Sequence, residues 1–430
     1  MKKLINSLNS GLNGELLIPG DKSISHRSIM LGSIANGETT IKNFLMSDDC
    51  ISTINAFKDM GVEIEQNENN IIVHGVGFHG LKKPNKDLDM GNSGTSTRLM
   101  MGLLAGQNFD SNLIGDNSLS KRPMKRISTP LEQMGAQIKL NENTLPAIIH
   151  GKSLNEIDYT LPIASAQVKS AIILAAIQAK NKSTIKEPIK TRNHTELMLN
   201  TFSPNTIITE ENTITINPVT QLIGQNINVP GDISSAAFFL VAGAITKNSN
   251  ITLKNIGINQ TRTGILKVLN LMGANYTLLN QNLDGEPTAD INIKSSSLKP
   301  INLTEQDIPM MIDELPLVGL LAACANGVSK ITGAKELRFK ETDRIKTLVQ
   351  EFKKLGISIT ELEDGFIIDG SKNWNPTDLL LDSHGDHRIG MTMAIAALLI
   401  KDSTTLKDSE SINISYPTFF NDLNKLIKTS

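Results

Sequence analysis

The chain has 430 residues, of which 39% are hydrophobic and 20% charged, and its formal net charge at pH 7 is −2. This length exceeds what one hydrophobic core usually holds, so two or three domains are expected. The near-neutral charge and the 4% aromatic content argue against nucleic-acid binding, which favours a basic surface and stacking rings. With only Cys50 and Cys324, neither a disulfide framework nor a cysteine-ligated metal site is expected.

No apolar run in Met1 to Leu17 is long enough for a signal peptide, and no stretch of the sequence reaches membrane-spanning length. We therefore expect a cytoplasmic protein with no membrane partner.

Polar turns that run into apolar helices recur six times along the chain. Between one turn and the next lie 67 to 81 residues, which predicts a sixfold repeat. The residues that mark the six openings are Asp21, Asn92, Ser165, Asp232, Asp313 and Asp386. In each unit a short alternating strand and a second helix are expected to follow. These second helices are predicted to begin near residues 47–49, 121–123, 191–193, 261–263, 340–344 and 415–417.

The clearest internal repeat is the tripeptide Pro-Gly-Asp, which occurs as Pro19-Gly20-Asp21 and again 211 residues later as Pro230-Gly231-Asp232. We interpret these two segments as the crossings between two domains of three units each. The first domain is predicted to be residues 20–229, and the second to combine residues 1–19 with 230–430. The repeat favours a radial arrangement with helices inside, which would bring the positive ends of the helix dipoles to one end of each domain.

Arginine is scarce, since only nine of the 42 basic residues are Arg. All nine lie in or beside the recurring turns: Arg27, Arg98, Arg122, Arg126, Arg192, Arg262, Arg338, Arg344 and Arg388. Because guanidinium forms a rigid fork that fits carboxylate or phosphate, this placement favours anion binding over the alternative that Arg merely forms helices well. Lys22, Lys169 and Lys340 add further cations at the openings.

Asp313, Glu314 and Glu341 are acidic residues among these cations. Proton transfer is one interpretation, and simple pairing with Lys340 and Arg344 is an equally weighted alternative. His384 and His387 with Asp386 could ligate a metal, but a helix cap explains this segment at least as well, and no metal is expected. No glycine-rich phosphate loop of the nucleotide-hydrolysing type is present.

Six segments together resemble the signatures of the 5-enolpyruvylshikimate-3-phosphate (EPSP) synthase family, and they cover nearly the whole chain in order. The segments are 20–27, 91–95, 122–126, 165–167, 340–344 and 386–388. The resemblance implies an α/β fold, a two-domain inside-out α/β barrel or prism, in which each domain has three βαβαββ units. It also implies an active site in the interdomain cleft, a monomer, and no cofactor.

The resemblance further implies that the enolpyruvyl group of phosphoenolpyruvate is transferred to the 5-hydroxyl of shikimate 3-phosphate, with release of phosphate, on the route to chorismate and aromatic amino acids. Asp313 is then the proton acceptor and also a substrate contact, Glu341 is the acid at the methylene carbon, and Lys22 is a third catalytic residue that contacts both substrates. The remaining residues expected to bind shikimate 3-phosphate are Ser23, Arg27, Ser165, Gln167 and Lys340. Those expected to bind phosphoenolpyruvate are Gly94, Arg122, Arg344 and Arg388, and Asn92 and Ala166 are two further substrate-binding candidates.

Within the family, residues 165–169, 192–196 and 259–262 look like those of the second, more glyphosate-tolerant class. Arg192 would then bind the phosphate of shikimate 3-phosphate. The segment near Ile414 lacks a lysine that the other class carries, which leaves one phosphoenolpyruvate contact without a counterpart. Gly94 is the residue that admits the inhibitor, so tolerance is a hypothesis.

Two alternatives are weighed against this interpretation. The UDP-N-acetylglucosamine enolpyruvyl transferases share the architecture, but they typically carry a reactive cysteine in a loop that corresponds here to Gly115–Arg126, which has none. A noncatalytic scaffold or RNA-binding relative would need a basic or aromatic stripe on an outer face, whereas the arginines here cluster at helix starts.

Overall fold

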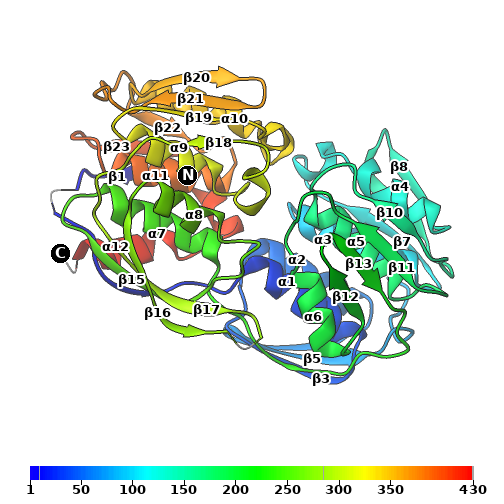
Figure 1. The fold of residues 1–430 in the computed structure, drawn as a ribbon. Coiled ribbons are helices and arrows are strands. Elements are labelled where there is room, and N and C mark those ends of the chain that lie inside the picture. The colour runs from blue at the N-terminus through cyan, green and yellow to red at the C-terminus, as the bar shows by residue number, and fades with distance from the viewer. Residues whose placement is uncertain (9, 284, 429–430) are drawn as a thin grey trace. The chain divides into compact units, whose positions relative to one another are not determined.

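The computed structural model describes residues 1–8, 10–283 and 285–428, which form two compact units (Figure 1). Unit 1 comprises Met1–Pro19 and Pro230–Ser430, and unit 2 comprises Gly20–Val229. The chain thus leaves unit 1 once and returns to it once.

Two complete βαβαββ repeats lie in unit 2. The first consists of β6 (Leu88–Asp89), α3 (Gly94–Ala105), β7 (Asp110–Ile114), α4 (Lys125–Gln133), β8 (Gln137–Asn141) and β9 (Thr144–His150). The second consists of β10 (Asp158–Thr160), α5 (Ala166–Ala176), β11 (Ser183–Lys186), α6 (His194–Phe202), β12 (Ile207–Glu210) and β13 (Thr213–Ile216). Each repeat closes its own sheet, in the orders β6-β7-β9-β8 and β10-β11-β13-β12, and only the first two strands of each sheet are parallel.

The remaining repeat of unit 2 borrows a strand from later in the chain. It consists of α1 (Lys22–Ile34), β3 (Asn36–Lys42), α2 (Asp48–Asp59), β4 (Glu63–Asn67) and β5 (Asn70–Val76). Its parallel strand is β14 (Asn226–Asn228), which pairs with β3. The strand that directly precedes α1, β2 (Asn13–Leu17), instead pairs in parallel with β15 (Asn250–Gly257) of unit 1. Thus β2 and β14, the strands that directly precede α1 and α7 (Ile233–Ile245), each pair in the sheet of the other unit's first repeat.

Unit 1 repeats the same order around three further helices. After β15 follow α8 (Gly264–Leu271), β16 (Asn275–Asn282) and β17 (Thr288–Lys294), all preceded by α7 (Ile233–Ile245). The next repeat is β18 (Asn302–Leu303), α9 (Leu315–Ala323), β19 (Val328–Ile331), α10 (Arg344–Lys354), β20 (Ser358–Leu362) and β21 (Gly365–Asp369). The last is β22 (Leu380–Asp382), α11 (His387–Ala397), β23 (Thr404–Lys407) and α12 (Phe419–Lys428). Its sheet has three strands, because β1 (Lys2–Ile5) pairs antiparallel with β23 where the other repeats have a hairpin.

The first helix of each repeat forms the core of its unit. Helices α7, α9 and α11 are buried along almost their whole length and pack against one another, and α3 packs closely on α5 in unit 2. Strands such as β9 and β17 alternate buried and exposed residues, as expected of sheets with one face on a core. The described strands form six separate sheets rather than a closed barrel.

Most of the predicted helix starts are confirmed. The side chains of Asp21, Ser165, Asp232 and Asp386 accept backbone N–H bonds at the starts of α1, α5, α7 and α11. Two openings begin one residue later than the predicted markers. Ser93 rather than Asn92 caps α3, and Glu314 rather than Asp313 occupies the cap position of α9.

Four of the second helices end at a glycine in the left-handed conformation. The φ angles of Gly61, Gly135, Gly273 and Gly356 lie between +74° and +92°. This conformation costs a residue with a Cβ free energy, so glycine stops the helix and turns the chain into the next strand.

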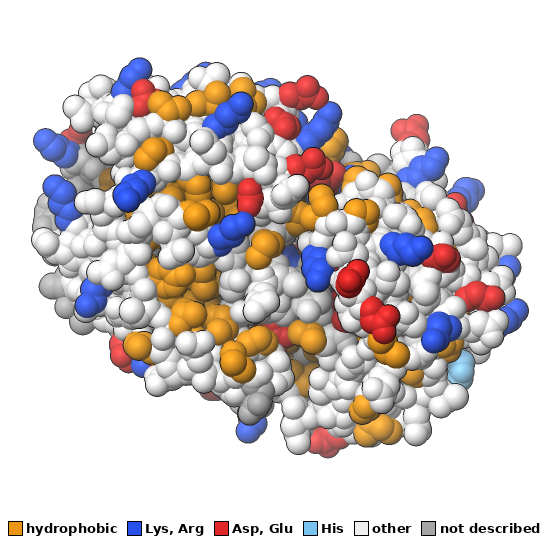
Figure 2. All heavy atoms as spheres, in the orientation of Figure 1, with side chains coloured by type: hydrophobic (Ala, Val, Ile, Leu, Met, Phe, Trp, Pro, Cys, Tyr) orange, Lys and Arg blue, Asp and Glu red, His pale blue; other side chains and the backbone are white. Residues whose placement is uncertain are grey.

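On the face shown in Figure 2, cationic and anionic side chains are interspersed over both units, in keeping with the net charge of −2. Among the described residues, every helix is too short or too polar to cross a lipid bilayer.

Candidate functional site

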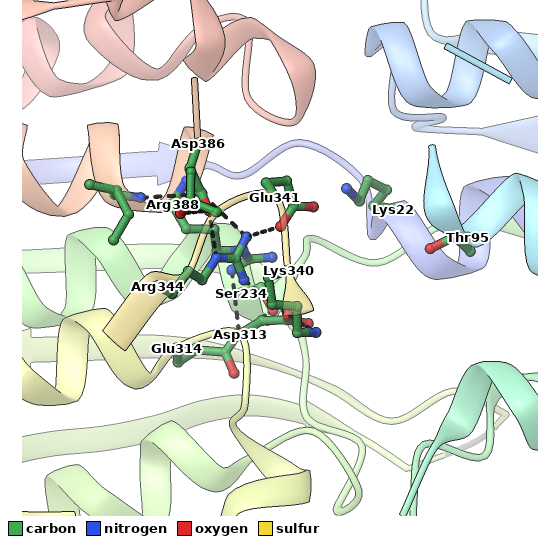
Figure 3. A network of polar contacts seen from close by, with 12 residues as sticks. Lys22, Thr95, Ser234, Asp313, Glu314, Lys340, Glu341, Arg344, Asp386 and Arg388 are labelled. Atoms are coloured by element: carbon green, nitrogen blue, oxygen red, sulfur yellow. Dashed lines mark hydrogen bonds and ion pairs between the residues drawn. The ribbon is translucent and has the colours of Figure 1, made fainter. Parts of the chain in front are cut away.

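In unit 1, charged side chains gather around Arg344, the first residue of α10 (Figure 3). Its side chain is only 1% exposed. Nε donates to Oδ2 of Asp386 at 2.7 Å, and one terminal nitrogen donates to Oε2 of Glu341 at 2.5 Å. The other terminal nitrogen lies 3.5 Å from Oδ1 of Asp313. Burial by itself would lower the pKa of Arg344, but the charges of these three carboxylates outweigh it and raise the pKa above its ordinary value.

Asp386 joins this cluster to the next helix. Its side chain is fully buried, and the same carboxylate that binds Arg344 accepts the backbone N–H of Arg388 at 2.8 Å at the start of α11. It also accepts a hydrogen bond from the hydroxyl of Thr342. The orientation of Arg344 and the start of the helix that carries Arg388 therefore depend on one side chain, which the sequence analysis had interpreted only as a cap.

Asp313 and Lys340 lie together at the more accessible edge of the cluster. Nζ of Lys340 donates to Oδ1 of Asp313 at 3.1 Å, and the two side chains are 28% and 15% exposed. Asp313 is thus an ion-paired carboxylate with access to solvent. The structure brings Asp313, Lys340, Glu341, Arg344 and Arg388 into one network.

A second set of contacts links the starts of α7, α9 and α11 below this edge. Glu314, which is 1% exposed, lies 3.5 Å from a terminal nitrogen of Arg388 and accepts a hydrogen bond from the hydroxyl of Ser234. Arg262 donates to that hydroxyl at 2.6 Å and to Asp232 at 3.2 Å. Each helix start is therefore tied to the next by a buried charged contact.

In unit 2, Lys22 is the first residue of α1, and its Nζ lies 2.9 Å from Oδ2 of Asp49 in α2. Its side chain is 19% exposed, so the ammonium group is held in place and remains accessible. Ser23 follows it in the first turn of the helix. Asp49 was missed by the sequence analysis, although its position in the first turn of the second helix was a usable signal.

Arg122 and Gly94 lie side by side. A terminal nitrogen of Arg122 donates to Oδ1 of Asn92 at 2.7 Å, and Nδ2 of Asn92 donates in turn to Asp116 at 2.7 Å. A methyl group added at Gly94 would lie 3.1 Å from the other terminal nitrogen of Arg122, which is a tight contact. Because Gly94 has no side chain, the guanidinium group of Arg122 can occupy its present position close to the backbone.

Gln167 is oriented by two neighbours on α3. Its amide oxygen accepts a hydrogen bond from Arg98, and its amide nitrogen donates to the hydroxyl of Thr95 at 3.1 Å. Ser165 caps the same helix, α5, and Ala166 is the first helical residue. The sequence analysis placed Arg98 among the anion-binding arginines but did not identify its contact with Gln167.

Arg27 is 5% exposed, and all three nitrogens of its guanidinium group donate within unit 2. Nε donates to the hydroxyl of Thr195 at 2.6 Å, one terminal nitrogen to the hydroxyl of Ser170, and the other to the backbone oxygen of Ser23. Arg27 thus ties α1 to α5 and α6.

Lys169 does not lie where the sequence analysis expected an anion-binding cation. It is fully buried, with Nζ 2.7 Å from Glu196 and 3.0 Å from Glu187. Two carboxylates already surround this ammonium group, so it is not available to an anionic ligand. Arg192, by contrast, lies partly exposed in the loop between β11 and α6.

His26 is buried beneath the starts of α1 and α3. Nδ1 lies 2.8 Å from the hydroxyl of Thr53 and 3.3 Å from that of Ser96. Burial, aided by the charges of Lys22 and Arg27, lowers the pKa of His26 well below its ordinary value, so the ring is neutral.

The described residues contain one group with metal-ligand spacing: Glu63, Glu65 and His74 on strands β4 and β5. Nε2 of His74 lies 2.9 Å from Oε1 of Glu65, and this hydrogen bond raises the pKa of His74. The pairing favours the imidazolium form, which cannot ligate a metal. Two residues that the sequence analysis weighed as metal ligands have other partners. Nε2 of His384 lies 2.8 Å from Oε1 of Glu351, and Asp386 accepts hydrogen bonds from Arg344 and from the backbone N–H groups at the start of α11.

Comparison with known proteins shows the family to which this chain belongs. The model of the family described as EPSP synthase (3-phosphoshikimate 1-carboxyvinyltransferase) matches residues 8–423. The chain is 52% identical over 429 residues to the 3-phosphoshikimate 1-carboxyvinyltransferase of Limosilactobacillus fermentum, and 50% identical over 427 residues to that of Lactiplantibacillus plantarum. In both cases 99% of each chain is covered.

Solved structures give the same result. The EPSP synthase of Acinetobacter baumannii superposes with a TM-score of 0.87 at 46% identity, covering 99% of this chain and 98% of that one. The enolpyruvyl transferase NikO of Streptomyces tendae shares the fold, with a TM-score of 0.80 at 15% identity. The fold is therefore one that enolpyruvyl transferases adopt, and the chain belongs to the EPSP synthase family.

Proposed function

We propose that the residues clustered in each unit carry out the reaction of the EPSP synthase family. The enzyme transfers the enolpyruvyl group of phosphoenolpyruvate to the 5-hydroxyl of shikimate 3-phosphate and releases phosphate, in the pathway to aromatic amino acids. The observation that carries the residue assignment is the network around Arg344, where two carboxylates with solvent access lie beside fixed cations.

In this proposal Asp313 accepts the proton of the 5-hydroxyl as the oxygen attacks carbon 2 of phosphoenolpyruvate, and Glu341 gives a proton to carbon 3. The product of these steps is a tetrahedral intermediate that expels phosphate and loses a proton from carbon 3 to regenerate the enol ether. Each acid or base step contributes about 10²- to 10⁴-fold, and positioning and electrostatic stabilisation supply the rest.

Phosphoenolpyruvate is assigned to Gly94, Arg122, Arg344 and Arg388, with Asn92 orienting Arg122 through their 2.7 Å hydrogen bond. Shikimate 3-phosphate is assigned to the remaining binding residues, and Lys22 to both substrates. These binding residues are Ser23, Arg27, Ser165, Ala166, Gln167, Arg192, Asp313 and Lys340. The fixed cations offset the repulsion between two anionic substrates, which would otherwise oppose their approach.

The direct test is to incubate the protein with shikimate 3-phosphate and phosphoenolpyruvate and to measure released phosphate. We expect release with this acceptor and none when UDP-N-acetylglucosamine replaces it. The reverse result would assign the chain to the nucleotide-sugar branch of the enolpyruvyl transferases, and release with neither acceptor would support a noncatalytic role.

Three finer assignments are also proposals. We infer the second, glyphosate-tolerant class from residues 165–169, 192–196 and 259–262, with Arg192 binding the shikimate phosphate. Glyphosate inhibition competitive with phosphoenolpyruvate at ordinary inhibitor concentrations would reject tolerance. A cytoplasmic monomer also stays a prediction, and light scattering of the purified enzyme tests the monomer.

A further inference from the structure

Lys169 poses a question that the substrate assignments leave open. Its ammonium group is fully buried in α5, with Glu187 at 3.0 Å and Glu196 at 2.7 Å. Burying one cation with two anions is costly, and such a cluster is often less stabilising than apolar residues of the same size. Since no substrate can reach a fully buried side chain, this cluster must act through the parts of the protein that it contacts.

The cluster holds the loop between β11 and α6 at one residue, Thr191. Oε2 of Glu187 accepts the backbone N–H of Thr191 at 3.2 Å and its hydroxyl at 3.0 Å. Nζ of Lys169 donates to the backbone oxygen of Thr191 at 3.3 Å. Thr191 is buried, whereas Pro188 and Lys190 before it are exposed. Three contacts to the buried pair thus fix a single point of a loop in which residues 188–190 and 192–193 are exposed or half-buried.

The C-terminal end of the same loop, where α6 begins, is held by Lys169 and Ser170 of α5. Lys169 pairs with Glu196 in the first turn of α6, and the hydroxyl of Ser170 lies 2.7 Å from that of Thr195. Arg192, the residue next to Thr191, is therefore held between two anchored points and is itself partly exposed.

We propose that Glu187 and Lys169 are positioning residues, which hold Thr191 so that the guanidinium group of Arg192 is preorganised for the phosphate of shikimate 3-phosphate. The inference rests on the proposed function, because it needs Arg192 to bind that phosphate. Preorganisation of this kind raises affinity by lowering the cost of ordering the binding group.

The test variant is Glu187→Gln. It removes one negative charge from a cluster that carries two anions and one cation, and Lys169 keeps Glu196, so the fold is expected to survive. The single amide oxygen of Gln cannot reproduce the contacts of the carboxylate with both Thr191 and Lys169. We expect the dissociation constant for shikimate 3-phosphate, measured by calorimetry, to rise about tenfold. The constant for unphosphorylated shikimate and the KM for phosphoenolpyruvate should change by less than about twofold.

Glu196→Gln is the matched control. It removes the same charge from the same cluster, but its amide oxygen can keep the single contact that Glu196 makes with Lys169, and the contact between Ser170 and Thr195 remains. Both contacts of Glu187 with Thr191 are unchanged, so shikimate 3-phosphate affinity should stay within about twofold. Thr191→Val, which deletes only the hydroxyl, is the milder variant should Glu187→Gln fail to fold, and it is expected to weaken binding about threefold.

The decisive measurement combines Glu187→Gln with Arg192→Ala. If the loop acts through Arg192, Glu187→Gln causes no further loss in the Arg192→Ala background. Equal losses for shikimate and shikimate 3-phosphate, wild-type affinity in Glu187→Gln, or additive losses in the double variant would each overturn the inference while leaving the proposed function intact. Wild-type affinity in Arg192→Ala would remove the Arg192 assignment and the inference together.

Discussion

Each unit of this protein buries arginines near its helix starts, and Arg27 of unit 2 and Arg344 of unit 1 are held differently. Arg27 of unit 2 donates to three uncharged acceptors, two hydroxyls and a backbone oxygen. Arg344 of unit 1 is surrounded by the carboxylates of Asp313, Glu341 and Asp386. Near its starts unit 2 also buries a neutral ring, His26, whereas unit 1 places Glu314 against Arg388.

The difference shows how one repeated architecture supports two tasks. Hydroxyl and amide contacts orient a cation without cancelling its charge, which suits the binding of anions. Carboxylates with access to solvent can accept and give up protons, which suits acid and base chemistry. Substitution of the accessible carboxylates of unit 1 should therefore impair mainly turnover, and substitution of the binding residues of unit 2 should impair mainly ligand affinity.

The largest effect is expected from Asp313→Asn. The amide keeps the shape of the side chain but cannot take the hydroxyl proton, so turnover should fall by about 10²- to 10⁴-fold with substrate affinity retained. Phosphate release and calorimetric binding are the two measurements. Near-normal turnover would exclude Asp313 as the base and weaken the contrast between the units.

Asp386→Asn tests the charged contact in the core of unit 1. It removes the negative charge beside Arg344 and leaves one acceptor oxygen where Arg344 now donates to two. It also weakens the cap of α11, so urea unfolding should show a loss of about 3 kcal/mol. Ser93→Ala removes an equivalent cap from α3 in unit 2, where no charge is involved, and should cost about 1 kcal/mol. Equal losses in the two variants would mean that the charges add nothing to the stability of unit 1.

Arg122→Lys tests affinity in unit 2. The guanidinium group of Arg122 can donate to Asn92 and still offer N–H groups to phosphoenolpyruvate, whereas the single ammonium group of lysine cannot form this fork. The KM for phosphoenolpyruvate should therefore rise about tenfold. The KM for shikimate 3-phosphate should change little. Equal losses for both substrates in Arg122→Lys would contradict the assignment.

The last expected effect is a pH dependence of stability that arises from His26. Its pKa is lowered in the folded state, so the unfolded chain binds the proton more readily as the pH falls below about 6.5. Stability should therefore be complete above that pH and decrease below it, by at most about 1.4 kcal/mol per pH unit from this group. His26→Gln should flatten this part of the curve in urea unfolding measured from pH 7 to pH 5. An unchanged curve would show that the ring titrates normally.

Much of the fold was predictable because the residues that start and end its helices act within a few positions of the chain. Asp21, Asp232 and Asp386 stand before apolar runs and do cap helices, and the glycines after four second helices adopt the left-handed conformation that ends a helix. The family was predictable too, since its signature segments span the chain. The roles of the site residues stay predictions, because each depends on a ligand.

Other features escaped local analysis because they depend on partners distant in the sequence. Lys169 was grouped with the anion-binding cations, but its neighbours across α5 and α6 are two carboxylates. Nothing in the residues around Gln167 indicates that Arg98, 69 residues earlier, orients its amide. A cap such as Asp386 looks the same in sequence whether or not a buried arginine donates to it.

The sequence by itself determined where helices start and stop, the sixfold period and the family, because capping, hydrophobic periodicity and glycine conformation act within a few residues of chain. Only the tertiary structure decided which charges are buried and which partner each one has. Burial and pairing are set by side chains tens of residues away, and they determine whether a cation is left for a ligand or is consumed inside the protein.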